Sequence, residues 1–71
     1  MGLQEIQARM RAAIKNSGMK QKDIANAIGV SAQTVSKYMK EDIFPALDTF
    51  AKLCALLDVS SDYILGISKE M

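Results

Sequence analysis

The sequence contains no histidine and a single cysteine, Cys54, among its 71 residues. One cysteine cannot form an internal disulfide, and a structural zinc site needs several cysteine or histidine ligands, so both kinds of cross-link are excluded. Because there is no histidine, Cys/His and Ser/His catalytic sites are also excluded. We therefore expect no metal and no cofactor, and a reducing location, the cytoplasm.

Long apolar runs are also missing. No 18-residue apolar window exists, and no charged segment precedes such a run, so we expect neither a membrane span nor a signal peptide. The chain lacks a glycine-rich phosphate loop, an inward-facing carboxylate pair and a nucleophile with a base beside it. These absences argue against an enzyme and against a small-molecule substrate.

The size and composition predict one domain covering residues 1–71, with 49% hydrophobic and 24% charged residues. The net charge is only +1, but residues 1–40 hold seven basic groups against two acids, whereas residues 41–71 hold two against six. This asymmetry is typical of a molecule that presents one face to an anion, and a solvated surface without a partner gives the same totals.

Apolar residues recur at three- and four-residue steps, which predicts helices and no strand. We expect an all-α bundle of five short helices: from Leu3 to Gly18, from Gln21 to Ile28, from the Ser31 cap to Met39, from Leu47 to Leu57, and from Tyr63 to Leu65, with a connection from Lys40 to Ala46. The inward positions predicted by this periodicity are Leu3, Ile6, Met10, Ala13, Ile14, Ile24, Ala25, Ile28, Val35 with Tyr38 or Met39, Leu47, Phe50, Leu53, Cys54 and Leu57. Lys20 precedes the second helix where a capping Ser or Thr is common, so that helix is expected to be weakly capped.

The second and third helices are joined by the segment IGVS, residues 28–31. This connection is too short for an antiparallel pair, so the two helices are expected to cross at roughly 90–120°, as in a helix-turn-helix. The third helix then protrudes, with Ala32, Gln33, Ser36 and Lys37 on its outer face.

The stretch QKDIANAIGVSAQTVSKYM, followed by a proline and by LDTFAKLCALLDVSSDYILG, resembles the lambda-repressor-like (XRE-type, phage repressor and Cro) helix-turn-helix family. The resemblance covers about residues 3–66 and rests on several features in order, including the glutamine that opens the second helix, Gly-Val-Ser at the turn, and Thr-Val-Ser inside the third helix. The family often has a glycine in the loop after the third helix, whereas this chain reads KEDIFP. The resemblance implies a lambda-repressor-like DNA-binding domain.

Two sets of DNA-contacting residues follow from this resemblance. Base edges would be read by Ala32, Gln33, Ser36 and Lys37. Phosphates would be contacted by Gln21, Ser31, Thr34, Lys40 and Lys22. By its chemistry, Gln33 can pair with adenine, Lys37 with guanine, and Ala32 with a thymine methyl group. The alternatives are that an outward glutamine is simply solvated, that small residues only permit close approach, and that Thr34 leans on its own helix. Arg9, Arg11 and Lys15 can line phosphates or merely aid solubility.

The expected function is a sequence-specific double-stranded DNA-binding transcriptional regulator, a phage-type or bacterial repressor. A single domain of this kind binds weakly, so a homodimer on a pseudo-palindromic operator is expected. The candidate dimer contacts, each of which can instead belong to the core, are Ile43, Phe44, Tyr63, Ile67 and Met71. The alternative is an antitoxin or another protein-interaction module on the same fold. We expect an antitoxin less than a repressor, because many antitoxins carry a toxin-binding tail and none is expected after Met71.

Overall fold

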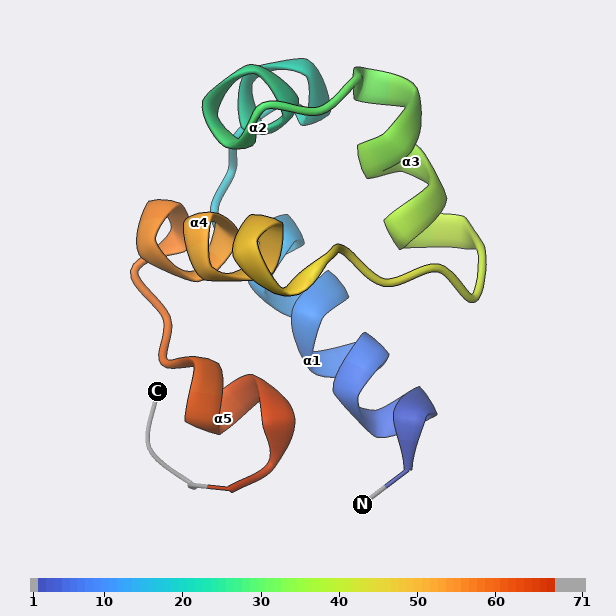
Figure 1. Ribbon diagram of the computed structural model, residues 1–71, viewed down its shortest axis with the longest axis vertical. Helices are drawn as coiled ribbons and strands as arrows, with labels where there is room; N and C mark the ends of the chain where they lie inside the picture. Colours follow the sequence, from blue (N-terminus) through green and yellow to red (C-terminus); the bar gives the residue numbers. More distant parts are fainter. Residues whose placement is uncertain (1, 68–71) are drawn as a thin grey trace.

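A computed structural model describes residues 2–67 of the chain and contains five helices joined by short connections (Figure 1). The helices are α1 (Leu3–Asn16), α2 (Gln21–Ile28), α3 (Ala32–Lys40), α4 (Leu47–Leu57) and α5 (Ser61–Leu65), and the described residues contain no strand. None of these helices is both long enough and apolar enough to cross a membrane. The all-α five-helix fold expected from the periodicity is therefore confirmed.

The helix ends follow local sequence signals. The Ser31 side chain accepts a hydrogen bond from the Thr34 backbone nitrogen at 3.1 Å and so caps α3. The backbone nitrogen of Asp62 donates to the Ser60 side chain at 3.1 Å, and this cap starts α5 at Ser61, earlier than the apolar pattern indicated. Lys20 gives α2 no side-chain cap, as expected. The N-terminal ends of α3 and α5 are thus encoded in the serine beside each of them.

All five helices contribute to one apolar core. Its fully buried members include Met10, Ile24, Val35, Leu53 and Ile64, one from each helix. In α3, Tyr38 is the buried residue and Met39 is only partly buried, which decides between these two alternatives. The core therefore ties α3 to the rest of the domain through a single side of that helix.

Two of the predicted inward positions were wrong. Leu3 is 69% exposed and Leu47 is 83% exposed. Each is the first residue of its helix, at the end of the apolar stripe, whereas Met10 and Phe50 further along the same helices are buried. Periodicity gives the direction of a side chain around the helix axis, but it does not show how far along the axis the core extends.

Helix α3 packs mainly against two helices, α2 and α1. Helix α2 contacts both α3 and α4, while α1 contacts α3 and α5. Figure 1 shows α3 turned away from α2 instead of folding back alongside it. Only one side of α3 can therefore face the core, and the other is presented to solvent.

The core should make the fold sensitive to alkaline pH. Burial raises the pKa of the Tyr38 phenol above its ordinary value of 10.0 and the pKa of the Cys54 thiol above its ordinary value of 9.0. Because both groups keep their protons more readily in the folded state, the stability they contribute is complete below the ordinary pKa and is lost as pH rises toward the folded pKa. Urea denaturation at stepped pH should show stability falling above about pH 9, and Tyr38→Phe should remove part of that fall. A flat profile up to pH 11 would contradict this expectation.

Candidate nucleic-acid interface

The turn between α2 and α3 fixes where α3 begins. Gly29 has φ 80° and ψ 30°, the left-handed conformation that glycine adopts most readily. The backbone nitrogens of Gly29 and Val30 both donate to the Ala25 carbonyl oxygen, at 2.9 and 3.0 Å. A Cβ atom at Gly29 would meet no neighbouring atom, so glycine is needed there for its backbone angles and not for space. The chain then changes direction within a few residues and enters α3 at Ala32, directly after the Ser31 cap.

Helix α3 is two-sided. Val35 and Tyr38 are buried against the core. On the other side, three of the four residues expected to read bases, Ala32, Gln33 and Lys37, are exposed, and the fourth, Ser36, is half-buried. The structure thus brings all four onto one short helix, with small and polar groups at the surface and apolar groups beneath them.

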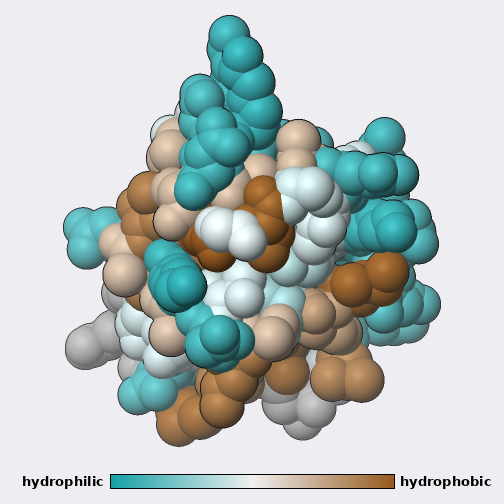
Figure 2. All heavy atoms as spheres, turned by 45° about the horizontal axis from the view of Figure 1, so that its top comes forward, coloured by the Kyte–Doolittle hydropathy of each residue, from teal (hydrophilic) through white to brown (hydrophobic). Residues whose placement is uncertain are grey.

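The residues expected to contact phosphate lie on the same two helices or beside them. Gln21 and Lys22 are exposed at the start of α2, and Lys40 is exposed at the end of α3. Figure 2 turns the top of Figure 1, where α2 lies, toward the reader, and hydrophilic side chains project around this face. Cations near the exposed face of α3 favour an anionic partner.

Ser31 and Thr34 form a local pair at the start of α3. Their side-chain oxygens lie 2.9 Å apart, and Ser31 also accepts the Thr34 backbone nitrogen. The half-buried Thr34 side chain therefore contacts the cap of its own helix, and the phosphate contact expected from the sequence stays a prediction. Ser31 is exposed and belongs to the cap, so its hydroxyl lies beside the backbone N–H groups of the first turn.

Two basic residues of α1 are turned inward. The Arg9 Nε atom donates to the Ile64 carbonyl oxygen at 2.9 Å, and the Arg11 Nε atom donates to the Tyr38 carbonyl oxygen at 2.8 Å. Both arginines are half-buried, whereas Lys15 on the same helix is exposed. From the sequence, Arg9 and Arg11 were expected either to contact phosphates or merely to aid solubility. The structure adds a third role, because both donate hydrogen bonds to the backbone of other helices.

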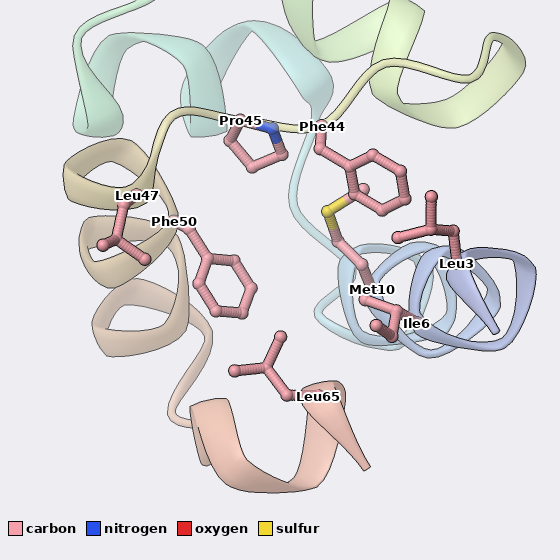
Figure 3. A pocket seen from close by; sticks show the side chains of 8 residues that line it. All are labelled: Leu3, Ile6, Met10, Phe44, Pro45, Leu47, Phe50 and Leu65. Atoms are coloured by element: carbon pink, nitrogen blue, oxygen red, sulfur yellow. The ribbon is translucent and has the colours of Figure 1, made fainter. Parts of the chain in front are cut away.

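An apolar groove lies between α1, α4 and α5 (Figure 3). It has a volume of about 240 Å³ and is lined from α1, from the connection between α3 and α4, from α4 and from α5, by Leu3, Ile6, Met10, Phe44, Pro45, Leu47, Phe50 and Leu65. The two leucines that the core does not cover, Leu3 and Leu47, are part of it. The sequence missed this groove because it assigned both leucines to the core.

The candidate dimer residues have different surroundings. Ile43 is 37% exposed, Phe44 is 36% exposed and lines the groove, and Ile67 is 73% exposed. Tyr63 is half-buried and packs against the core. Met71 lies outside the described residues. Three of the five are thus apolar side chains with substantial exposure.

The chain is similar to known proteins over most of its length. Residues 10–64 match the family model described as Helix-turn-helix. The chain is 34% identical over 58 residues to the HTH-type transcriptional regulator ImmR of Bacillus subtilis (strain 168), which covers 82% of this chain and 46% of that protein. It is 34% identical over 62 residues to the uncharacterized HTH-type transcriptional regulator YobD of the same organism, covering 87% of this chain and 55% of that protein. The chain therefore spans about half the length of these curated relatives, and no solved structure matches it significantly.

Proposed function

The chain belongs to the XRE-type helix-turn-helix family of transcriptional regulators, and from this premise we propose that it binds double-stranded DNA sequence-specifically as a phage-type or bacterial repressor. The observation that carries the proposal is the two-sided character of α3. Its apolar side is fixed in the core by Val35 and Tyr38, while Ala32, Gln33 and Lys37 face solvent. A major groove admits a helix of this kind and offers a distinct hydrogen-bonding pattern for each base pair.

The proposed base contacts follow from side-chain chemistry. Gln33 donates and accepts through one amide, which matches the N7 and N6 positions of adenine, and Lys37 donates to guanine O6 and N7. Ala32 packs on a thymine methyl group, and Ser36 donates or accepts at a neighbouring base edge. Each well-formed bidentate contact discriminates against a wrong base by about 1–3 kcal/mol.

The proposed phosphate contacts surround these positions. Lys22 and Lys40 supply charge, and Gln21 and Ser31 supply hydrogen-bond donors, at exposed positions of α2 and α3. Thr34 supports Ser31 through their 2.9 Å contact. The first-turn N–H groups of α3 point in the direction from which a phosphate approaches a helix N-terminus. Phosphate contacts fix the position of the domain on DNA and leave sequence discrimination to α3. We also propose a cytoplasmic location, in keeping with a DNA partner and a bacterial or phage-type repressor.

We further propose that the active form is a homodimer on a pseudo-palindromic operator. One domain measures 29 × 23 × 22 Å, so two copies in contact can place their recognition helices about 34–36 Å apart, one helical turn of DNA. The apolar groove, with Phe44 beside exposed Ile43, supplies a surface for the second copy, and Ile67 adds exposed apolar area. Tyr63 and Met71 remain dimer candidates from the sequence.

A charge placed in the groove should weaken the dimer. Phe44→Asp puts a carboxylate on an apolar, partly exposed position, and in a symmetric interface the two new charges would be desolvated close to each other. We expect the dimer dissociation constant to rise on the order of tenfold or more, measured by sedimentation equilibrium. The control is Ala8→Asp, an exposed α1 position about half a turn from the groove-lining Ile6 and Met10. Equal self-association in both variants and the parent would contradict the assignment of this surface.

The proposed function is tested by selecting preferred sites from random duplex DNA and titrating the binding with salt. A sequence-reading dimer should enrich a pseudo-palindrome and show a steep linear fall of log affinity with log salt concentration. Equal affinity for enriched and random DNA would overturn the proposal. Equal affinity for all DNA sequences, together with tight binding to a protein partner, would instead support the alternative of a protein-interaction module.

A further inference from the structure

The C-terminal end of α3 is held by side chains of another helix and not by a local left-handed cap. The Glu41 backbone nitrogen donates to the Lys37 carbonyl oxygen at 2.8 Å, but Glu41 itself is extended, with φ −123° and ψ 165°. Helices α2, α4 and α5 instead end in a left-handed residue. The last carbonyl groups of a helix have no partner within it, so at the end of α3 they depend on donors from elsewhere.

Three hydrogen bonds reach this end from α1. Gln7 Nε2 donates to the Glu41 carbonyl oxygen at 2.8 Å, and Arg11 donates from Nε to the Tyr38 carbonyl oxygen at 2.8 Å and from Nη2 to the Glu41 carbonyl oxygen at 3.0 Å. We name Gln7 and Arg11 the α1 clamp. A guanidinium holds its N–H groups in one rigid plane, so binding two carbonyls fixes them relative to each other. Its positive charge also lies at the negative end of the α3 dipole.

Burial makes the α1 clamp difficult to replace by water. Gln7 is only 4% exposed and is the one buried polar residue among residues 2–67. Arg11 is half-buried, its Nε bond to Tyr38 is partly buried, and its Nη2 bond to Glu41 is exposed. Partly buried hydrogen bonds are stronger than exposed ones, and removing one partner leaves the other poorly satisfied. The end of α3 is therefore attached to α1 chiefly by the two partly buried bonds, from Gln7 Nε2 and from Arg11 Nε.

We propose that Gln7 and Arg11 are positioning residues for DNA recognition, which act by fixing the direction of Lys37. This inference rests on the proposed function. One of the two carbonyls that Arg11 binds belongs to Tyr38, the residue directly after Lys37. Gln33 lies nearer the other end of α3, where Ser31 supplies a separate local cap. Loosening the α1 clamp therefore displaces Lys37 more than Gln33, and base discrimination is lost first at the base pair that Lys37 reads.

The test compares base discrimination in the parent chain and in Arg11→Met. The base pair that Lys37 reads is first located as the position where Lys37→Ala changes the selected site. At that position, Arg11→Met should lower the affinity ratio between the preferred and an altered base pair roughly fivefold, the lower end of what one base contact contributes. The ratio at the Gln33 position and the slope of log affinity against log salt should stay unchanged. Lys52→Met, which removes a charge from an exposed position of α4, should leave both ratios unchanged.

Three other outcomes overturn the inference, each in a distinguishable way. A salt slope that falls by about one, with all sites weakened equally, would mean that Arg11 contacts phosphate directly. A lower melting temperature with unchanged base ratios would mean that the α1 clamp only stabilises the fold. A parent chain without any preferred site would overturn the proposed function itself. If Arg11→Met does not fold, Arg11→Lys and Gln7→Met are measured in the same way, since each keeps part of the α1 clamp, and both should lower the Lys37-position ratio.

Discussion

Gln33→Ala is expected to weaken binding to the preferred operator by roughly 5- to 100-fold while leaving affinity for random DNA nearly unchanged. Gln33 is exposed on the outer side of α3 and is neutral, so its removal changes no electrostatic contact with phosphate. The loss should be confined to one base pair in each half-site, because a bidentate amide contact reads a single base. Electrophoretic mobility shifts or fluorescence anisotropy on the selected site and on single-position variants of it measure this directly.

Two controls separate base reading from general weakening. Gln4→Ala removes the same amide from an exposed position at the start of α1 and should change neither specific nor random binding. Lys22→Ala removes a proposed phosphate contact, so it should weaken all sequences about equally and reduce the salt slope by about one. If Gln33→Ala resembled Lys22→Ala, or behaved like the parent on every sequence, the assignment of α3 as the reading helix would be wrong.

The sequence predicted α2, the turn and α3 well because their signals are local. Gly29 takes the left-handed conformation that a helix end favours, and Ser31 caps α3 through its own backbone neighbours. Both features depend on residues within a few positions of each other. The element that presents the proposed site could therefore be placed from the sequence alone.

The hydrogen bonds from α1 to the C-terminal end of α3 could not be predicted in the same way. Arg11 binds carbonyl groups 27 and 30 positions away, and Gln7 binds one 34 positions away. Such pairs depend on how α1 packs on α3, and no local pattern encodes that. One signal was present, because Gln7 falls between Leu3 and Met10 at helical spacing, on the stripe assigned to the core. A polar residue at such a position indicates a buried hydrogen-bond partner, although it does not identify the partner.

Leu3 and Leu47, which the sequence analysis wrongly assigned to the core, illustrate a second limit of prediction from hydrophobic periodicity. Leu3 and Leu47 fit the apolar stripes of their helices, yet both are largely exposed and line the groove. Hydrophobic periodicity treats every position on a stripe alike, whereas burial also depends on whether a neighbouring helix reaches that far. Apolar residues at the start of a stripe are therefore candidates for an interface as well as for the core.

The second large effect is expected at Ile24, which is fully buried in α2, the helix that contacts both α3 and α4. Ile24→Ala should lower the free energy of unfolding by about 2–5 kcal/mol, because it removes buried apolar atoms and leaves a cavity that the surrounding helices fill only in part. A domain of this length is stabilised by roughly 4–10 kcal/mol in total. The melting temperature should therefore fall on the order of 10 °C or more, measured by circular dichroism.

Leu47→Ala is the matched control, since Leu47 is an aliphatic residue of the same size that is 83% exposed. Measured at a protein concentration where the chain is monomeric, it should change stability by less than about 0.5 kcal/mol. DNA binding by Ile24→Ala should fall only in proportion to the unfolded fraction, and its base preferences should remain those of the parent, because Ile24 supports α3 without facing DNA. Similar melting temperatures for the two variants would show that α2 is not anchored by the buried apolar core, and α3 would then lack the rigid base that sequence discrimination needs.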